Sequence, residues 1–269
     1  MTDPNAGQLG ARLLARDAGL WPDPNVSGTR LGWLEVPRQM AEESKDLASW
    51  AATIEQSTVI LLGMGGSSLG PAVLEAVRAT GPAGVHRRLV VCDTTDPTTV
   101  GGLDFSDAFV LVSSKSGTTL EPNVLFEHAW SKLPDPSRYA AVTDPGTALC
   151  TLGAERGFRR VFENRPDIGG RYSVLSYFGM VPAALLGYDV AELCERALSS
   201  DLDDAVELGW EMGQAARQGK DKVTIVVPEA FRSFGLWVEQ LIAESTGKRG
   251  TGCVPVPTTD CLLYTSRCV

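Results

Sequence analysis

An alternation of short apolar runs with helical patterns, which begins at residue 58, constrains the fold more than any other feature of this chain. The runs are rich in β-branched residues and almost wholly apolar, as is typical of strands buried on both faces of a parallel sheet. They lie at residues 58–62, 88–93, 108–114 and 139–143. Because helical patterns separate them, the chain is expected to form an α/β fold with a doubly wound parallel sheet.

The helical patterns fill the intervals between the strands and continue beyond them. They cover residues 41–56, 71–79, 120–133, 147–157, 173–187, 190–200 and 201–219. Turn signals at residues 21–28 predict a loop. A further strand-like run at 222–230 is followed by a helical pattern at 231–248, and this pair indicates the opening of a second α/β unit.

The balance of charge excludes one class of partner and constrains how another can bind. The chain has 24 Lys and Arg residues against 33 Asp and Glu residues, which gives a formal net charge of −9. A grip on the nucleic-acid backbone needs clustered cations, so we expect no nucleic-acid partner. Since no general positive field surrounds the chain, an anionic ligand has to be held by local geometry.

The sequence also predicts no membrane span, export signal or metal site. No apolar run is long enough to cross a bilayer, and the N-terminus lacks a basic region leading into an apolar core. We therefore expect a cytoplasmic protein with reduced cysteines, because its six cysteines show no CxxC spacing. The two histidines, His86 and His128, are too isolated for a metal site, and we assign neither a catalytic role.

Three segments at the ends of strands or the starts of helices are rich in glycine or hydroxyl groups, and ligands bind at such positions in open α/β sheets. The first is residues 63–71, where glycines allow the backbone to approach a ligand closely. With Asp93 as a ribose-binding acid it would resemble a dinucleotide loop, but Ser68 takes the place of the third glycine of that motif. A tight structural turn is the alternative interpretation.

The second segment, residues 113–119, carries five hydroxyl groups and precedes a helix that begins near Leu120. Hydroxyl donors, backbone N–H groups and the positive end of the helix dipole suit a phosphate monoester. The alternative is a simple Ser or Thr helix cap, which needs only one hydroxyl. No Walker-type motif accompanies the segment, so it favours a sugar phosphate over a nucleotide.

The third segment, residues 167–173, and the last helical pattern each offer one charged side chain. Arg171 follows two glycines, where it can face a ligand or serve a structural ion pair. Glu244 lies on nearly the same side of its helix as Trp237, so it is either a carboxylate in a partly apolar setting for proton chemistry or part of a helix end capped by Gly247. The apolar stripe expected to be buried on this helix consists of Phe234, Trp237, Val238, Leu241 and Ile242.

Taken together, these segments resemble the phosphoglucose isomerase family, also called glucose-6-phosphate isomerase. The resemblance rests on the order and spacing of motifs at residues 63–71, 113–123, 142–147, 166–179 and 237–248. The motifs are closest to the isomerase half of the bacterial fusion of transaldolase with phosphoglucose isomerase. No transaldolase half precedes Met1, so we expect no transaldolase activity.

The resemblance implies two sugar-isomerase (SIS) domains that interconvert glucose 6-phosphate and fructose 6-phosphate through a cis-enediolate, with no metal or organic cofactor. It implies that Arg171 steadies the enediolate and that Glu244 is the base that moves a proton between C1 and C2. Lys115 would contribute mainly its backbone, and Gly117, where many relatives carry a larger residue, would leave the loop undisturbed. The residues implied to bind the substrate are Gly66, Ser67, Ser114, Lys115, Ser116, Thr118 and Thr119.

The resemblance also divides the chain. We expect an N-terminal helical and loop segment (1–54), a first SIS domain (55–190), linking helices (191–221), an incomplete second SIS domain (222–257) and a tail that does not continue it (258–269). The family's ring-opening histidine, often donated by a partner subunit, and its late lysine lie beyond the glutamate motif, and this chain ends before either. We therefore expect a homodimer when the protein is full length, and an inactive or nearly inactive chain on its own.

Two other functions stay open at this point. A non-catalytic sugar-phosphate-binding SIS domain would need the hydroxyl segment at 113–119 but neither Arg171 nor Glu244. A Rossmann-type oxidoreductase would need the glycine motif that Ser68 interrupts. The joint presence of Arg171 and Glu244 favours the isomerase.

Overall fold

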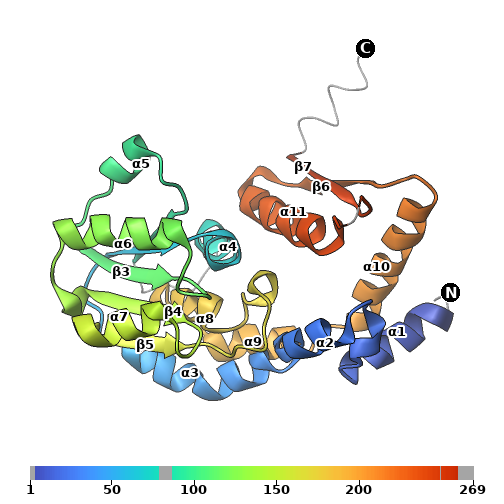
Figure 1. Ribbon diagram of the computed structural model, residues 1–269, viewed down its shortest axis with the longest axis horizontal. Helices are drawn as coiled ribbons and strands as arrows, with labels where there is room; N and C mark the ends of the chain where they lie inside the picture. Colours follow the sequence, from blue (N-terminus) through green and yellow to red (C-terminus); the bar gives the residue numbers. More distant parts are fainter. Residues whose placement is uncertain (1–3, 79–86, 249, 260–269) are drawn as a thin grey trace, which may run out of the picture.

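The largest element of the computed structural model, which describes residues 4–78, 87–248 and 250–259, is a five-stranded sheet (Figure 1). Its strands are β1 (Thr58–Gly63), β2 (Arg88–Cys92), β3 (Ala108–Ser113), β4 (Tyr139–Thr143) and β5 (Arg160–Glu163). All neighbouring strands are parallel, in the order β2-β1-β3-β4-β5. The predicted α/β fold with a parallel sheet is confirmed, and β1 to β4 lie at the apolar runs.

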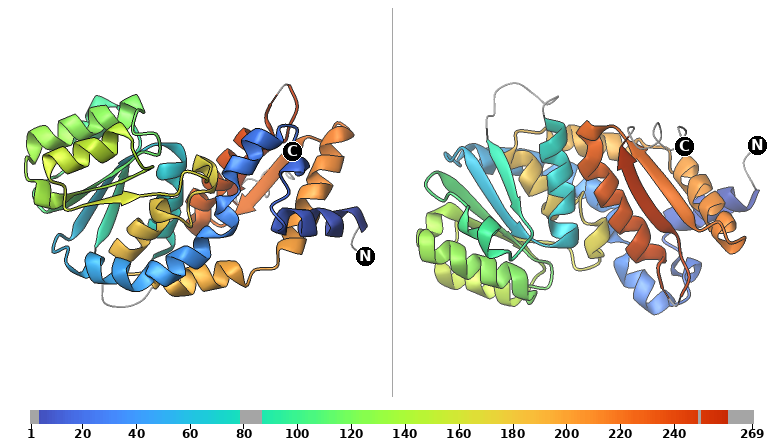
Figure 2. Two further views of the ribbon diagram at one scale, coloured as in Figure 1. Left: turned by 60° about the horizontal axis from the view of Figure 1, so that its bottom comes forward. Right: turned by 90° about the horizontal axis from the view of Figure 1, so that it is seen from above.

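Helices cover both faces of this sheet, with α3, α8 and α9 on one face and α6 and α7 on the other (Figures 1 and 2). The helices are α1 (Pro4–Leu14), α2 (Pro24–Ser27), α3 (Val36–Ala52), α4 (Leu69–Val77), α5 (Pro97–Gly101), α6 (Leu120–Lys132), α7 (Ala148–Arg156), α8 (Tyr177–Leu185), α9 (Val190–Leu198), α10 (Leu202–Arg217) and α11 (Arg232–Thr246). The sheet is therefore doubly wound, as its apolar strands predict.

Alternate side chains of each central strand enter two separate apolar cores, because successive residues of a strand point to opposite faces. On β1, Val59 and Leu61 join the core beneath α3 and α8, whereas Ile60 and Leu62 join the core beneath α6. All four side chains are buried. Burial of one such side chain contributes about 1.5–3 kcal/mol, so the two cores hold the central strands and the loops at their ends in place.

The order of the strands creates a switch point between β1 and β3. The chain crosses from β1 to β2 on one side and then returns to β3 on the other side. Gly63 at the end of β1 is in register with Ser113 at the end of β3. The loops that follow these two strands therefore emerge side by side, at the position where open α/β sheets bind their ligands.

Several elements that precede β6 are not predicted individually from the sequence, among them α1, α2, α5 and β5. β5 is a four-residue edge strand that begins and ends with charged Arg160 and Glu163, so it lacks a long apolar run. α5 is a single short turn of five residues. α2 lies within residues 21–28, where a loop is predicted, and it forms because Asp23 accepts hydrogen bonds from the N–H groups of its first turn.

A second, two-stranded parallel sheet consists of β6 (Lys222–Val227) and β7 (Val254–Thr259), with α11 packed against it (Figure 2). β7 is not predicted, because its prolines Pro255 and Pro257 are unusual in a strand that has neighbours on both sides. It includes residues 258–259, the first two of the expected tail, which pair with β6. Residues 260–269 lie outside the described part of the chain.

The apolar stripe predicted on α11 is not buried. Phe234 is exposed, and the buried position is Gly235, which packs against Val227 and Pro257. The two-stranded sheet is too narrow to cover the whole stripe, and this accounts for the difference. The other residues of the stripe are half-buried: Trp237, Val238, Leu241 and Ile242.

Candidate functional site

A cleft of about 700 Å³ opens at the carboxyl ends of β1 and β3. Segments far apart in the sequence meet there: the loops after β1, β3 and β4, the loop at residues 166–172, and the N-terminal segment through Val26 and Arg30. The predicted site residues that line it are Gly66, Ser67, Ser114, Lys115, Ser116, Thr119 and Arg171. Thr118 and Glu244 do not line it.

The hydroxyl segment (residues 113–119) leaves the end of β3 and enters α6. Ser114 is only 3% exposed, and its backbone N–H donates to the carbonyl of Val142 at 3.0 Å, which holds the segment against β4. The Ser114 hydroxyl is buried and has no hydrogen-bond partner among the described residues. Because an unsatisfied buried hydroxyl costs about 1–3 kcal/mol, this group is a candidate donor to a ligand.

The N-terminus of α6 faces the same cleft. Thr119 stands at the N-cap but makes no side-chain hydrogen bond to the helix, so the simple helix cap is not the role of this hydroxyl. The hydroxyl of Ser116 accepts bonds from the N–H (3.2 Å) and the hydroxyl (3.0 Å) of Thr118, and Thr118 does not line the cleft. The positive end of the α6 dipole is thus presented together with hydroxyl groups, which is an arrangement suited to an anion.

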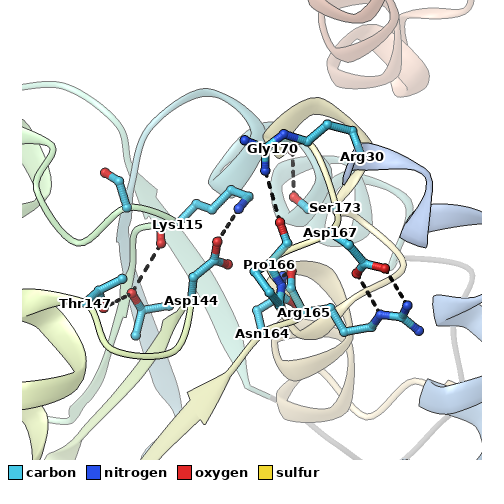
Figure 3. A network of polar contacts seen from close by, with 12 residues as sticks. Arg30, Lys115, Asp144, Thr147, Asn164, Arg165, Pro166, Asp167, Gly170 and Ser173 are labelled. Atoms are coloured by element: carbon cyan, nitrogen blue, oxygen red, sulfur yellow. Dashed lines mark hydrogen bonds and ion pairs between the residues drawn. The ribbon is translucent and has the colours of Figure 1, made fainter. Parts of the chain in front are cut away.

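The side chain of Lys115 is engaged within the protein. Its ammonium forms an ion pair with Asp144, and its carbonyl accepts the N–H of Asp144 at 3.1 Å (Figure 3). Asp144 is a cleft residue that the sequence does not single out, although it lies in the motif at 142–147. The pair neutralises both charges, so Lys115 adds little net charge for an anion in the cleft.

Gly66 lies where two loops touch. It belongs to the turn Gly65–Ser67, which packs against the turn Gly170–Tyr172, and a Cβ on Gly66 would overlap the carbonyl oxygen of Gly170. Only glycine allows this approach. Asp93, the acid that a dinucleotide site would use, is exposed and outside the cleft.

Gln240 is a neighbour of this loop that the sequence does not single out. Its amide nitrogen lies 3.1 Å from the position that a Cβ on Gly65 would occupy, so a side chain of α11 reaches the loop after β1. Gln240 precedes Glu244 by four residues and therefore lies on the same side of α11. That spacing is the signal that could have identified it.

Arg171 and Glu244 form an ion pair between the two units of the chain. The guanidinium Nη1 donates to the carboxylate Oε2 at 2.7 Å. Glu244 is 49% exposed and a guanidinium faces it, so of the two settings that the sequence leaves open it has that of a helix end, which Gly247 caps, and not the partly apolar one. Nε of Arg171 is buried and has no partner among the described residues.

A cluster of charges joins the loop that leads to Arg171 to the N-terminal segment, and Figure 3 shows its Arg165–Asp167 pair. Nε and Nη2 of Arg165 donate to the two carboxylate oxygens of Asp167, at 2.8 and 2.6 Å. These bonds hold the pKa of Asp167 below its ordinary value. Arg16 contacts both Glu35 and Asp167, and Glu35 also contacts Arg165. These ion pairs with the N-terminal segment hold the backbone that precedes Arg171.

The remaining sequence candidates lie away from the cleft. His128 is half-buried on α6 beside Phe105, and His86 lies outside the described residues.

Within the described ranges, no cluster of His, Cys, Asp or Glu could hold a metal ion, and no helix has the length and apolar character needed to cross a bilayer. The cysteines that the structure describes are free: Cys92, Cys194 and Cys253 are buried, and Cys150 is half-buried.

Comparison with known sequences agrees with the resemblance of the motifs. A family model described as phosphoglucose isomerase matches residues 35–203. The glucose-6-phosphate isomerase of Trichormus variabilis is 29% identical over 274 residues, which cover 92% of this chain and 51% of that protein. The chain thus spans about half the length of the curated relatives it matches.

Comparison with solved structures agrees at the level of the fold. A hypothetical protein from Thermus thermophilus has a TM-score of 0.78 at 25% identity, covering 98% of this chain and 66% of that one. A glucose-6-phosphate isomerase from Chlamydia trachomatis has a TM-score of 0.65 at 22% identity, covering 94% of this chain and 54% of that one. Both likenesses extend over the second unit as well as the first.

Proposed function

Because the chain belongs to the phosphoglucose isomerase family, we propose that it is a portion of an enzyme that interconverts glucose 6-phosphate and fructose 6-phosphate, a step of glycolysis and gluconeogenesis. The observation that carries the proposal is the hydrogen bond of 2.7 Å between Arg171 and Glu244, beside a cleft lined by the hydroxyl segment. A cation and a carboxylate in contact are the two groups that proton transfer next to a carbonyl requires.

In this proposal the phosphate of the sugar binds at the N-terminus of α6. The hydroxyls of Ser114, Ser116 and Thr119 donate to it, and the helix dipole favours its charge. Holding the phosphate positions the distant carbons C1 and C2, so binding energy from the phosphate contributes to the rate of the chemical step. Gly66 and Ser67 line the part of the cleft next to Arg171 and would contact the sugar.

The proton transfer then falls to Glu244. Its carboxylate takes the proton from C2 of the open-chain aldose, the electrons move toward the C1 carbonyl, and a cis-enediolate forms. Arg171 stabilises the negative oxygen, since Nη1 and the unpartnered Nε are both N–H donors. The proton of the O2 hydroxyl passes to O1, Glu244 returns its own proton to C1, and the ketose with a carbonyl at C2 results; this is general acid–base catalysis worth about 10²–10⁴-fold.

A non-catalytic sugar-phosphate-binding domain is the other function that the hydroxyl segment could serve. Such a domain has no need of a carboxylate in contact with an arginine at the edge of the cleft. The Arg171–Glu244 pair therefore favours the isomerase.

The first experiment separates these functions from a dinucleotide enzyme by calorimetry on this chain. We expect it to bind 6-phosphogluconate and glucose 6-phosphate but not NADH. Binding of NADH without binding of either sugar phosphate would contradict both sugar-phosphate functions.

The second experiment tests catalysis in a full-length protein that contains this sequence. We expect Glu244→Gln to lower kcat for isomerisation by about 10²-fold or more, the contribution of one general base. Glu239→Gln, a neutralised glutamate on the same helix that makes no ion pair in the described residues, serves as the control. Undiminished activity of Glu244→Gln would remove Glu244 from the mechanism.

The assembly and location of the full-length protein belong to the same proposal. We propose a cytoplasmic homodimer, and we expect this chain alone to be inactive or nearly so because the family's ring-opening histidine and late lysine are not in it. Sedimentation equilibrium of the full-length protein and an isomerase assay of this chain check the two statements. Robust turnover by this chain would show that both of those groups are dispensable.

A further inference from the structure

The cations that line the cleft differ in whether a carboxylate balances them. Lys115 is paired with Asp144, and Arg171 is paired with Glu244. Arg30 also lines the cleft, and within the described residues it forms no ion pair. It is therefore the cation in this cleft whose charge is still available to an anion.

Arg30 is held in place without losing its charge. Its Nη1 donates to the carbonyl oxygen of Pro166 at 3.0 Å, so the side chain extends over that loop toward the side of the cleft that carries Lys115 (Figure 3). A guanidinium has five N–H donors, and this bond uses one of them. The others remain for a ligand.

Two carboxylates of the N-terminal segment, Asp23 and Glu35, have partners other than Arg30. Asp23 caps the first turn of α2 by accepting the N–H groups of Asn25 and Val26. Glu35 lies 2.8 Å from Arg16 and also contacts the Arg165 guanidinium. Arg30 is consequently not the second half of an internal ion pair that the fold requires.

A phosphate monoester near pH 7 carries close to two negative charges. The hydroxyls of the segment at 113–119 are neutral donors, and the N-terminus of α6 supplies the equivalent of only about half a positive charge. In a chain with a net charge of −9, the general field does not balance the negative charge that remains on the phosphate. An unpaired guanidinium in the same cleft supplies positive charge that can balance it.

We propose that Arg30 is a further substrate-binding residue, which donates to the phosphate of the bound sugar phosphate from the side opposite the hydroxyl segment. The proposal rests on the sugar-phosphate function proposed above. It gives the N-terminal segment a direct role in binding, and Arg30 lies outside residues 35–203, the part of the chain that the family model matches.

Calorimetry with two probes, inorganic phosphate and glucose 6-phosphate, tests the proposal on this chain. We expect Arg30→Gln to weaken the binding of both probes by about 10-fold or more, the effect of one charge-assisted hydrogen bond. Arg30→Lys should restore part of the affinity, because it keeps the charge but not the planar fork. The parent should lose affinity more steeply with added salt than Arg30→Gln.

Arg38→Gln is the matched control. Arg38 is an exposed arginine of the same N-terminal segment, on α3, and it does not line the cleft. Removing its charge lowers the net charge of the chain by the same amount as Arg30→Gln. We expect both probes to bind this variant as they bind the parent.

The outcomes separate this inference from the proposed function. Equal affinities of the parent and Arg30→Gln would overturn the role of Arg30, as would a loss confined to glucose 6-phosphate, which would place Arg30 on the sugar. If glucose 6-phosphate binds no more tightly than phosphate while Arg30→Gln weakens both, the sugar-phosphate function fails and the anion contact of Arg30 stands. Absence of binding of either probe to the parent would overturn both.

Discussion

At the scale of single residues, Gly117 occupies the point where the hydroxyl segment passes close to the start of α7 on its way to α6. Its φ of +64° lies in the left-handed region, which costs residues with a Cβ about 1–2 kcal/mol. A Cβ would also lie 2.9 Å from the backbone nitrogen of Leu149, which cannot move aside as the tip of a side chain can. In this chain the segment follows a path that only glycine suits.

Gly117→Ala is therefore expected to lower the free energy of unfolding by about 1–2 kcal/mol or more and to weaken phosphate binding. Urea denaturation and phosphate calorimetry measure the two effects. Gly209→Ala, in α10, is the control, because no atom lies within 4 Å of its added Cβ and the change should stabilise the helix. A Gly117→Ala variant as stable as the parent would mean that the segment relaxes to another path.

The sequence identifies individual site residues better than their partners. The hydroxyl segment and Arg171 are recognisable because motifs place them after strands or at helix starts. The bond between Arg171 and Glu244 joins residues 73 positions apart, and no local pattern predicts it. Asp144 and Arg30 were missed for the same reason, since tertiary packing alone brings them to the cleft.

At the scale of elements, the loop between β5 and the turn at Gly170–Tyr172 depends on the N-terminal segment for its position. Asp167 is the centre of that attachment: its carboxylate receives Arg165, and its carbonyl accepts the N–H of Gly32 at 2.9 Å. Leu31 and Ile168 add a short antiparallel bridge beside it. The loop that presents Arg171 is thus part of a paired structure.

Asp167→Asn should destabilise the chain at pH 7, and the difference should shrink as the pH falls. The bonds from Arg165 lower the pKa of Asp167 from its usual 3.8 in the folded state. A lowered carboxyl pKa contributes stability above about pH 4, and that stability is lost as the pH falls through the folded-state pKa. Urea midpoints of both proteins from pH 7 to about pH 3 test this.

Asp46→Asn is the control for that prediction. The carboxylate of Asp46 also pairs with an arginine, Arg160, at a similar distance of 2.6 Å, but it lies away from the cleft. We expect Asp167→Asn to weaken sugar-phosphate binding and Asp46→Asn to leave it unchanged. Equal binding by the two variants would show that the charge cluster does not position Arg171.

The strands that are buried on both faces were all predicted from the sequence, and so were β2 and β6, which have one neighbour each among the described strands but still carry an apolar run. β1, β3 and β4 are buried on both faces, so their sequences are continuous apolar runs. β5 and β7 have one neighbour each in the described chain, and charged residues or prolines interrupt them. The partial burial of α11 depends on how much sheet lies beneath it, which periodicity alone does not report.

At the scale of the whole molecule, the two sheets differ in how they are covered, because apolar side chains are exposed on one face of the two-stranded sheet. Val226, Val254 and Val256 lie on the face of the two-stranded sheet away from α11, and each is more than 40% exposed. Contiguous apolar surface of this kind, with strand edges beside it, favours association with another chain. In this respect the second unit differs from the first, whose sheet is covered on both faces.

We therefore expect this chain to self-associate with rising concentration, and Val256→Lys to reduce the association. Sedimentation velocity over a range of concentrations measures it. Val124→Lys, which places the same charge at an exposed valine of α6, should have no effect. If Val124→Lys abolished the association and Val256→Lys did not, the associating surface would belong to the first unit instead.

The ion pair between Arg171 and Glu244 has one partner on each unit, whereas the hydroxyl segment belongs wholly to the first. Under the proposed function, a displacement of α11 relative to the large sheet would move Glu244 away from the bound sugar without altering the contacts proposed for its phosphate. The affinity for a ligand and the rate of its conversion can therefore change independently in this fold. Substitutions at the contact between α11 and α4 could slow turnover while leaving occupancy of the cleft unchanged.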